Sequence, residues 1–378
     1  MSSESISVVE GINSSLATVI DPELHRPITE LGMVESVEIS SGAAVVKILL
    51  TIPGCPMRER LDRDIRAAVL GVDGVTSIDL TFGSMNEEQR ANVKNIMRGG
   101  REKTIQFALP NSLTRVIGVA SGKGGVGKSS VTVNLAVAAA RAGFKVGILD
   151  ADVYGHSVPR LMGVLGERPT AIDQFFIPVE KYGVKVVSME MFKPERSDPI
   201  AYRGPLLHRV LEQLLSDAYW GDLDLLLLDL PPGTGDIAIS LGQLLPASEI
   251  LVVTTPQVAA AEVAERAGRI AHQLKQQILG VVENMSDVPC PHCGEPVAIF
   301  GSGGGEETAT RLSNLVGGEV KLLAQIPFDS ALREGGDNGH PITLAHPDAL
   351  ASKAIHELLA KLMTRPRSLV GVPLTLHT

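Results

Sequence analysis

A glycine-rich loop near the middle of the chain combines the residue types that bind nucleotide phosphates. It runs Gly122-Lys123-Gly124-Gly125-Val126-Gly127-Lys128-Ser129, between an apolar segment typical of a buried strand and a predicted helix over 129–142. Glycines let successive backbone N–H groups converge on a β-phosphate, and the helix N-terminus adds a favourable dipole. Lys128 can reach the β- and γ-phosphates, and Ser129 can ligate Mg²⁺. The loop predicts a nucleotide site rather than a merely flexible turn, and we include the next residue, Ser130, in it.

Acidic residues follow two other apolar segments. The run 225–228 ends at Asp229, a position that suits contact with Mg²⁺, directly or through water. The backbone N–H of Gly233, in the next turn, is placed to sense a γ-phosphate. Asp150 and Asp152 end another segment and lie on the same face of the chain. An aspartate in such a place is often only a cap or turn former, but together with the loop these residues favour a phosphate site.

Two cysteines form the second group that could do chemistry, in the sequence Cys290-Pro291-His292-Cys293-Gly294. Thiolates at this spacing can share one metal ion or one iron-sulfur cluster. A tetrathiolate site needs four ligands, and the third cysteine, Cys55, lies far away in the chain. A complete site would therefore require two subunits, which predicts a homodimer.

Other interpretations of the cysteine pair stay open. A zinc knuckle shared across a dimer would use the same ligands, and plain structural cysteines are a further alternative. A strongly oxidising thioredoxin-fold oxidoreductase would also contain this sequence, but it would need an export signal and a thioredoxin-like strand and helix, and neither is evident.

The residues after a late apolar run indicate which nucleotide base the site would bind. A guanine site of the small-GTPase kind would need Asn-Lys-x-Asp after a late strand. The chain has Val-Val-Glu-Asn-Met-Ser at 281–286 instead, and ATP is the better prediction.

These residues need a scaffold that gathers the ends of several strands. After residue 112, short runs rich in Val, Ile and Leu recur with helices between them, which is typical of parallel strands buried on both faces. The fold class predicted is α/β, a doubly wound and mostly parallel sheet over 113–365, preceded by a small α/β domain over 1–95. The weakly patterned residues 96–112 indicate a linker, and 366–378 a loosely held tail.

Composition narrows the function classes. The 378 residues include 44% hydrophobic, 20% charged and 3% aromatic residues and have a net charge of -9. Scarce aromatics and an acidic balance argue against a nucleic-acid ligand. We find no signal peptide, and no apolar run reaches the roughly 20 residues of a membrane span, so we predict a cytoplasmic protein without a membrane partner.

The additional lysine near the start of the loop, Lys123, gives the sequence a resemblance to the deviant phosphate-loop ATPases that include MinD, ParA and the nitrogenase iron protein, P-loop NTPases of the SIMIBI type. The resemblance implies that Lys123 crosses a nucleotide-sandwiched dimer to the partner's phosphates, as an arginine finger does. A solvated surface lysine is the alternative. It also implies that Asp152 positions or deprotonates the attacking water, with Asp150 supporting lysine and magnesium. By the same resemblance Asn284 contacts the base edge and Pro327 lies against the adenine.

Residues 113–365 more closely resemble the Mrp (ApbC-type) iron-sulfur cluster carrier ATPases. The matching stretches, in order, are SGKGGVGKSS, LDADVYGHSVPRLMG, AYRGP, LDLPPGTGD, VENMSDVPCPHCG and FGSGGGEE. His156 and Tyr202 depart from the family's usual Pro and Trp. The N-terminal domain resembles the small PaaD- and SufT-like domain, through DPE at 21–23, LGMV at 31–34 and TIPGCP at 51–56. Cys55 within it is either a metal or sulfur ligand or a half-buried structural cysteine.

The resemblance implies a homodimeric ATPase that uses ATP and Mg²⁺ and holds a [4Fe-4S] cluster between Cys290 and Cys293 of each subunit. It would transfer this cluster to apoproteins, with cluster scaffold proteins as further partners. Two alternatives remain: a MinD- or ParA-like positioning switch, and a zinc-stabilised regulatory ATPase dimer. The C-terminal RPRSLVGVPLTLHT contains two prolines and offers no basic amphipathic helix for membrane targeting.

Overall fold

The computed structural model describes residues 3–51, 57–100, 103–152, 155–193, 205–233, 235–290 and 292–364. Cys55, Tyr202 and the predicted tail 366–378 lie outside these residues. The chain divides into two compact units, Met1–Thr104 together with Thr170–Ile177, and Ile105–Pro169 together with Pro178–Thr378. We call them the N-terminal unit and the C-terminal unit.

The N-terminal unit is built on a small mixed sheet. Its elements are α1 (Ser3–Leu16), β1 (Val34–Ser40), β2 (Ala43–Leu50), α2 (Arg58–Leu70), β3 (Ser77–Ser84), α3 (Glu87–Met97), β6 (Thr170–Ile172) and β7 (Phe175–Ile177). The order is β1-β2-β3, with β1 antiparallel and β3 parallel to β2. Strand β2 alternates buried and exposed residues, and α2 buries Leu61, Ile65 and Val69 at helical spacing. Helix α1 ends at Leu16, and Ile20 pairs with Pro27 in the following loop.

The hairpin of β6 and β7 joins this unit although its residues lie inside the region 113–365. Asp173, at its turn, forms ion pairs with Arg90 (3.3 Å) and Lys94 (2.6 Å) of α3. The guanidinium of Arg98 lies over the Phe175 ring, 5.6 Å from its centroid. The hairpin is thus held by the charges of α3 and its C-terminal end.

The C-terminal unit contains an eight-stranded sheet in the order β15-β12-β11-β4-β10-β5-β9-β8. The strands are β4 (Arg115–Ser121), β5 (Val146–Asp150), β8 (Val179–Lys181), β9 (Val184–Ser188), β10 (Leu225–Asp229), β11 (Glu249–Thr254), β12 (Gln277–Asn284) and β15 (Leu322–Ile326). All neighbouring strands pair in parallel except β8, which is antiparallel to β9. The predicted doubly wound, mostly parallel sheet is confirmed.

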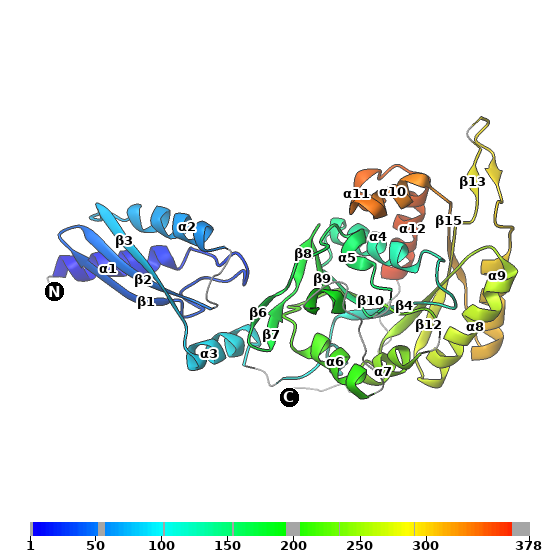
Figure 1. Cartoon of the computed structure of the whole chain (residues 1–378), viewed down its shortest axis with the longest axis horizontal. Coiled ribbons are helices and arrows are strands. Elements are labelled where there is room, and N and C mark those ends of the chain that lie inside the picture. The colour runs from blue at the N-terminus through cyan, green and yellow to red at the C-terminus, as the bar shows by residue number, and fades with distance from the viewer. Residues whose placement is uncertain are drawn as a thin grey trace, which may run out of the picture. The chain divides into compact units, whose positions relative to one another are not determined.

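Helices cover both faces of this sheet (Figure 1). One group that packs together comprises α4 (Lys128–Arg141), α5 (Val158–Leu161), α10 (Ser330–Asn338), α11 (Ile342–Ala345) and α12 (Leu350–Met363). The other comprises α6 (Pro205–Ser216), α7 (Asp236–Leu244), α8 (Val258–Gln273) and α9 (Gly304–Val316). Two 3₁₀ turns, η1 (Gln106–Ala108) and η2 (Met189–Phe192), and a short ribbon, β13 (Val288–Pro289) with β14 (Pro296–Val297), complete the unit.

The core lies around α4, which buries apolar side chains on nearly all its faces against the sheet and α12. Because the strands are parallel, β4, β5, β10, β11 and β12 end at one edge, with Ser121, Asp150, Asp229, Thr254 and Asn284 as last residues. In the described parts of the chain, no helix has the length and apolar character to cross a membrane.

Candidate nucleotide site and cysteine hairpin

The glycine-rich loop connects β4 to α4, as the sequence predicts. Gly125 and Gly127 adopt left-handed conformations, with φ of 80° and 81°, which only glycine adopts without strain. A Cβ atom added to Gly124 or Gly125 would meet no atom within 4 Å, so this part of the loop is open. It faces a cleft of about 570 Å³, whose lining includes Lys123, Lys128, Ser129, Ser130 and Asp152. The structure brings these predicted site residues together.

The other two glycines of the loop serve close packing. A Cβ atom on Gly122 would lie 2.2 Å from the backbone carbon of Val263 in α8. One on Gly127 would lie 2.2 Å from Nδ2 of Asn284. These positions require glycine because α8 and the end of β12 pack directly against the loop.

Asp229 is the centre of a buried polar network at the start of α4. Its Oδ1 lies 2.8 Å from Lys128 Nζ, and its Oδ2 accepts a 2.6 Å hydrogen bond from Ser129 Oγ. Thr132 Oγ1 donates to Oδ1 at 2.9 Å. Neighbouring oxygen ligands of an octahedral Mg²⁺ lie roughly 3 Å apart. The oxygens of Ser129 and Asp229 are thus close to the spacing at which both could hold one magnesium ion, and their chemistry fits this cation.

Two further carboxylates follow β5 in different environments. Asp150 is buried, and accepts hydrogen bonds from Ser188 Oγ (3.1 Å) and the Asp152 N–H (3.2 Å). Burial raises the pKa of Asp150 well above its ordinary value, the nearby Asp229 raises it further, and Lys128 opposes both effects. Asp152 lines the cleft and accepts a 2.9 Å hydrogen bond from the Gly155 N–H. Asp152, not Asp150, therefore has the position from which a carboxylate could act on a water molecule in the cleft.

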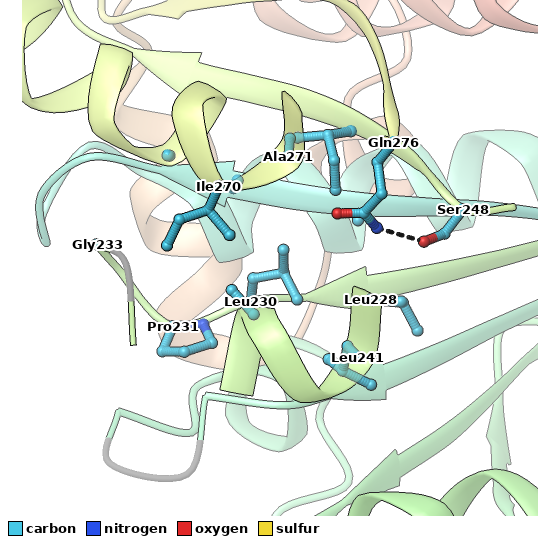
Figure 2. A pocket seen from close by; sticks show the side chains of 14 residues that line it. Leu228, Leu230, Pro231, Gly233, Leu241, Ser248, Ile270, Ala271 and Gln276 are labelled. Carbon is cyan, nitrogen blue, oxygen red and sulfur yellow. Dashed lines mark hydrogen bonds between the residues drawn. The ribbon is translucent and has the colours of Figure 1, made fainter. Parts of the chain in front are cut away.

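The turn after β10 is tied to the phosphate loop. The N–H of Gly233, predicted to sense a γ-phosphate, donates a 2.9 Å hydrogen bond to the Ser121 carbonyl. Behind this turn is a cavity of about 20 Å³, with room for about one water molecule, and Figure 2 shows Leu230 and Pro231 opposite Ile270 of α8. The amide of Gln276 donates to Ser248 Oγ at 2.6 Å on the cavity wall. The turn thus packs against α8 with a small free volume behind it.

Asn284 is the last residue of β12, and Pro327 directly follows the neighbouring strand β15, but the two residues lie in different surroundings. Asn284 donates from Nδ2 to the Val126 carbonyl at 2.9 Å, while its buried Oδ1 has no hydrogen-bond partner in the protein. That oxygen could accept a further hydrogen bond, but it is buried, and Asn284 does not line the phosphate-loop cleft, so its contact with a base stays a prediction. Pro327 lines a second cleft of about 610 Å³, together with Ser286 and Asp287, and does not line the phosphate-loop cleft.

Lys123 is held by a residue that sequence reasoning missed. Its Nζ donates a 2.8 Å hydrogen bond to Oε1 of Gln257, which precedes α8. The only local signal for Gln257 is its place directly after a buried strand, in the sequence Thr-Thr-Pro-Gln.

The cysteine pair lies on the β13–β14 hairpin, which extends away from the large sheet (Figure 1). The Cys290 N–H donates to the Glu295 carbonyl, and the Gly294 N–H donates back to the Cys290 carbonyl, both at 2.8 Å. Cys290 is half-buried, Cys293 is exposed, and both are free thiols. Backbone N–H groups of Cys293 and His292 lower the pKa of the Cys290 thiol, because they stabilise its thiolate.

The hairpin supplies too few ligands for a complete site. Within the described residues, no group of three or more His, Cys, Asp or Glu side chains is arranged to hold a metal ion. A metal or cluster bound by Cys290 and Cys293 would therefore need ligands from outside this part of the chain.

Two protein families match the sequence. One, described as a NUBPL iron-transfer P-loop NTPase, matches residues 112–363, and the other, described as an iron-sulfur cluster assembly protein, matches residues 10–80. The chain belongs to the iron-sulfur cluster carrier family of P-loop NTPases. The resemblance expected from its motifs is confirmed.

Known relatives extend over almost the whole chain. An iron-sulfur cluster carrier protein of Mycobacterium tuberculosis is 52% identical over 367 residues, which cover 97% of this chain and 96% of the relative. A protein of the same name from Deinococcus radiodurans is 43% identical over 342 residues, 90% of this chain and 91% of its own. A nucleotide-binding protein of Archaeoglobus fulgidus, solved in complex with ADP, is 37% identical with a TM-score of 0.51, and covers 61% of this chain and 92% of its own.

Proposed function

We propose that this carrier works as a cytoplasmic homodimer that binds and hydrolyses ATP, holds a [4Fe-4S] cluster between two copies of the chain, and transfers the cluster to apoproteins. The observation that supports the proposal most strongly is the exposed cysteine hairpin, which presents two thiols on the same unit as the phosphate loop.

The count of ligands favours a cluster that bridges two chains. A [4Fe-4S] cluster is held by four thiolates, and one hairpin provides two. Cys290 has a lowered pKa and Cys293 is exposed, so both sulfurs are suited to reversible binding. A second copy of the hairpin would complete the set, and its separation from the first would release the cluster.

The phosphate-loop cleft suits ATP hydrolysis. Lys128 would exchange Asp229 for the β- and γ-phosphates, and Ser129 and Asp229 would hold Mg²⁺, which when bound neutralises charge on the phosphate oxygens. A water molecule attacks the γ-phosphorus and gives its proton to Asp152 as the bond to the bridging oxygen breaks and ADP leaves. Lys123 of the partner chain would stabilise the charge that develops on the transferred group.

Metal analysis of anaerobically purified and reconstituted protein tests the cluster. We expect about four iron and four sulfide per dimer with a cysteine-dependent absorption band. Both should be lost in the double variant Cys290→Ala/Cys293→Ala and kept in Cys55→Ala, which serves as the matched control. Stoichiometric zinc, or metal content that does not depend on Cys290 and Cys293, would contradict the proposal.

A further inference from the structure

The loop between β11 and α8 contacts two functional parts of the C-terminal unit. On one side, Gln257 Oε1 accepts the 2.8 Å hydrogen bond from Lys123 Nζ. Gln257 is exposed and stands directly before α8, so its side chain can release the lysine without disturbing the core. The loop therefore holds the ammonium group of Lys123 by one exposed hydrogen bond.

On its other side, the same loop holds the start of α9. The Pro256 carbonyl accepts a 3.0 Å hydrogen bond from the N–H of Gly304, the first residue of α9. A Cβ atom on Gly304 would lie only 2.5 Å from the Thr255 carbonyl oxygen, so the two backbones are in direct contact. The cysteine hairpin ends at Val297, shortly before Gly304. A displacement of the loop would thus move the start of α9, which follows the cysteine hairpin by a few residues.

Helix α8 makes a second, parallel connection. Its backbone at Val263 packs on Gly122 of the phosphate loop, and a Cβ atom on its Gly268 would lie 2.1 Å from Leu312 of α9. Glu265 of α8 pairs with Arg311 of α9 at 3.6 Å. One rigid helix therefore contacts the phosphate loop and the helix that follows the cysteine hairpin.

The loop also contains polar groups that are not satisfied in this arrangement. The hydroxyls of Thr254 and Thr255 are buried, with side chains in residues only 1% and 6% exposed, and neither has a hydrogen-bond partner in the protein. A buried hydroxyl without a partner favours any alternative arrangement in which it gains one.

We propose that Gln257 is a positioning residue for Lys123 and that residues 254–257 relay the state of this lysine to the cysteine hairpin. When Lys123 turns to the phosphates of the partner chain, Gln257 loses its hydrogen bond, and the loop shifts the start of α9 through Pro256 and Gly304. The inference rests on the proposed function, because it takes ATP hydrolysis across a dimer as the reaction that Lys123 serves.

Two substitutions of opposite effect test the role of Gln257, with Gln277→Ala as a control at an exposed glutamine on the first residue of β12. Gln257→Ala should free Lys123 and raise kcat about two- to fivefold with KM unchanged, the range expected for one exposed hydrogen bond. Gln257→Glu should hold the lysine by an ion pair and lower kcat. Added salt should raise the kcat of this variant again, because salt screens an exposed ion pair. Equal loss of activity in both variants, or wild-type kinetics in both, would overturn the inference.

A second measurement needs no hydrolysis. Without ATP, the rate at which an amine-reactive acetyl ester modifies Lys123, followed by mass spectrometry, should rise in Gln257→Ala and fall in Gln257→Glu relative to Gln277→Ala. Equal rates would show that Gln257 does not hold the lysine. If the wild type fails to hydrolyse ATP, the proposed function fails, while this measurement still decides the contact.

Hydrogen exchange tests the relay itself. A non-hydrolysable ATP analogue should change the exchange of backbone amides over 292–304 in the wild type and in Gln277→Ala, and should change it much less in Gln257→Ala. The same change in all three proteins, or none in the wild type, would contradict a relay through this loop.

Discussion

Lys128 and Asp229 form a buried ion pair within the protein. Their side chains are 6% and 0% exposed, and the Asp229 carboxylate has only Lys128 as a cationic partner within hydrogen-bond distance among the described residues. A buried carboxylate that loses its partner is costly, since its charge stays out of water without compensation. The lysine therefore stabilises the fold, in addition to the phosphate-binding role that we propose for it.

We predict that Lys128→Met abolishes ATP hydrolysis and also lowers the free energy of unfolding by about 3 kcal/mol. The double variant Lys128→Met/Asp229→Asn should regain part of that stability, because it removes the uncompensated charge. Urea unfolding gives these values, with Lys145→Met at an exposed lysine as the control. A Lys128→Met protein as stable as the wild type would show that the ion pair contributes nothing to the fold.

At the residue scale, local patterns predict some parts of the site better than others. The sequence predicts that the loop glycines, Lys128 and Ser129 lie together because strand, loop and helix follow each other directly, and it places Asp229 at the end of another buried apolar run. The hydrogen bonds Lys123–Gln257 and Asn284–Val126 join residues more than 130 positions apart, so spacing gives no sign of them. Pro327 lies in another cleft for a similar reason, since the turn after β15 is set by its pairing with the loop after β12.

At the scale of elements, the turn after β10 depends on apolar packing over an imperfectly filled space. Leu230 is 4% exposed and lines the 20 Å³ cavity beside Pro231 (Figure 2). Leu230→Ala should enlarge this cavity and lower the free energy of unfolding by about 3 kcal/mol in urea titrations. Ile239→Ala, at an exposed position of α7, should change it by less than about 1 kcal/mol. A cost for Leu230→Ala as small as that of the control would contradict the packing argument.

The β6–β7 hairpin depends on charge instead. The hydrogen bond from Lys94 is the main cause that lowers the pKa of Asp173, and Arg90 contributes. Because the pKa is lower in the folded protein, the stabilisation is present above the ordinary pKa of about 4 and is lost as the pH falls through the lowered value. Asp173→Asn should therefore speed hydrogen exchange of residues 170–177 at pH 7, with a difference from the wild type that narrows as the pH falls below about 4.

Asp348→Asn, at an exposed aspartate elsewhere, is the control for that comparison and should leave the exchange of 170–177 unchanged. A difference between Asp173→Asn and the wild type that stays the same size as the pH falls below about 4 would mean that the ion pairs are not its cause.

Element length explains what the sequence could and could not predict about the fold. Long apolar runs such as 225–228 and 250–253 identify the parallel strands, because burial on both faces removes the alternation of polar residues. Strands β6, β7 and β8 have three residues each, too few for any periodicity. The sequence pattern therefore does not predict the antiparallel edge strand β8 or the β6–β7 hairpin of the N-terminal unit.

At the scale of the whole molecule, the proposed cluster site is divided between two chains. The cysteine hairpin has two free thiols, and apolar side chains lie exposed beside it, with Val297 47% and Ile299 62% accessible. Two copies that met at this hairpin would complete four thiolates and remove these apolar groups from water. Nucleotide state would then control the cluster by controlling how the two copies face each other.

Native mass spectrometry of the anaerobically reconstituted protein shows whether one cluster bridges two chains. We predict a dimer that contains one [4Fe-4S] cluster, and a cluster-free species for Cys290→Ala/Cys293→Ala. A cluster or metal ion on the monomer, or a dimer whose bound metal is unaffected by loss of both cysteines, would contradict it.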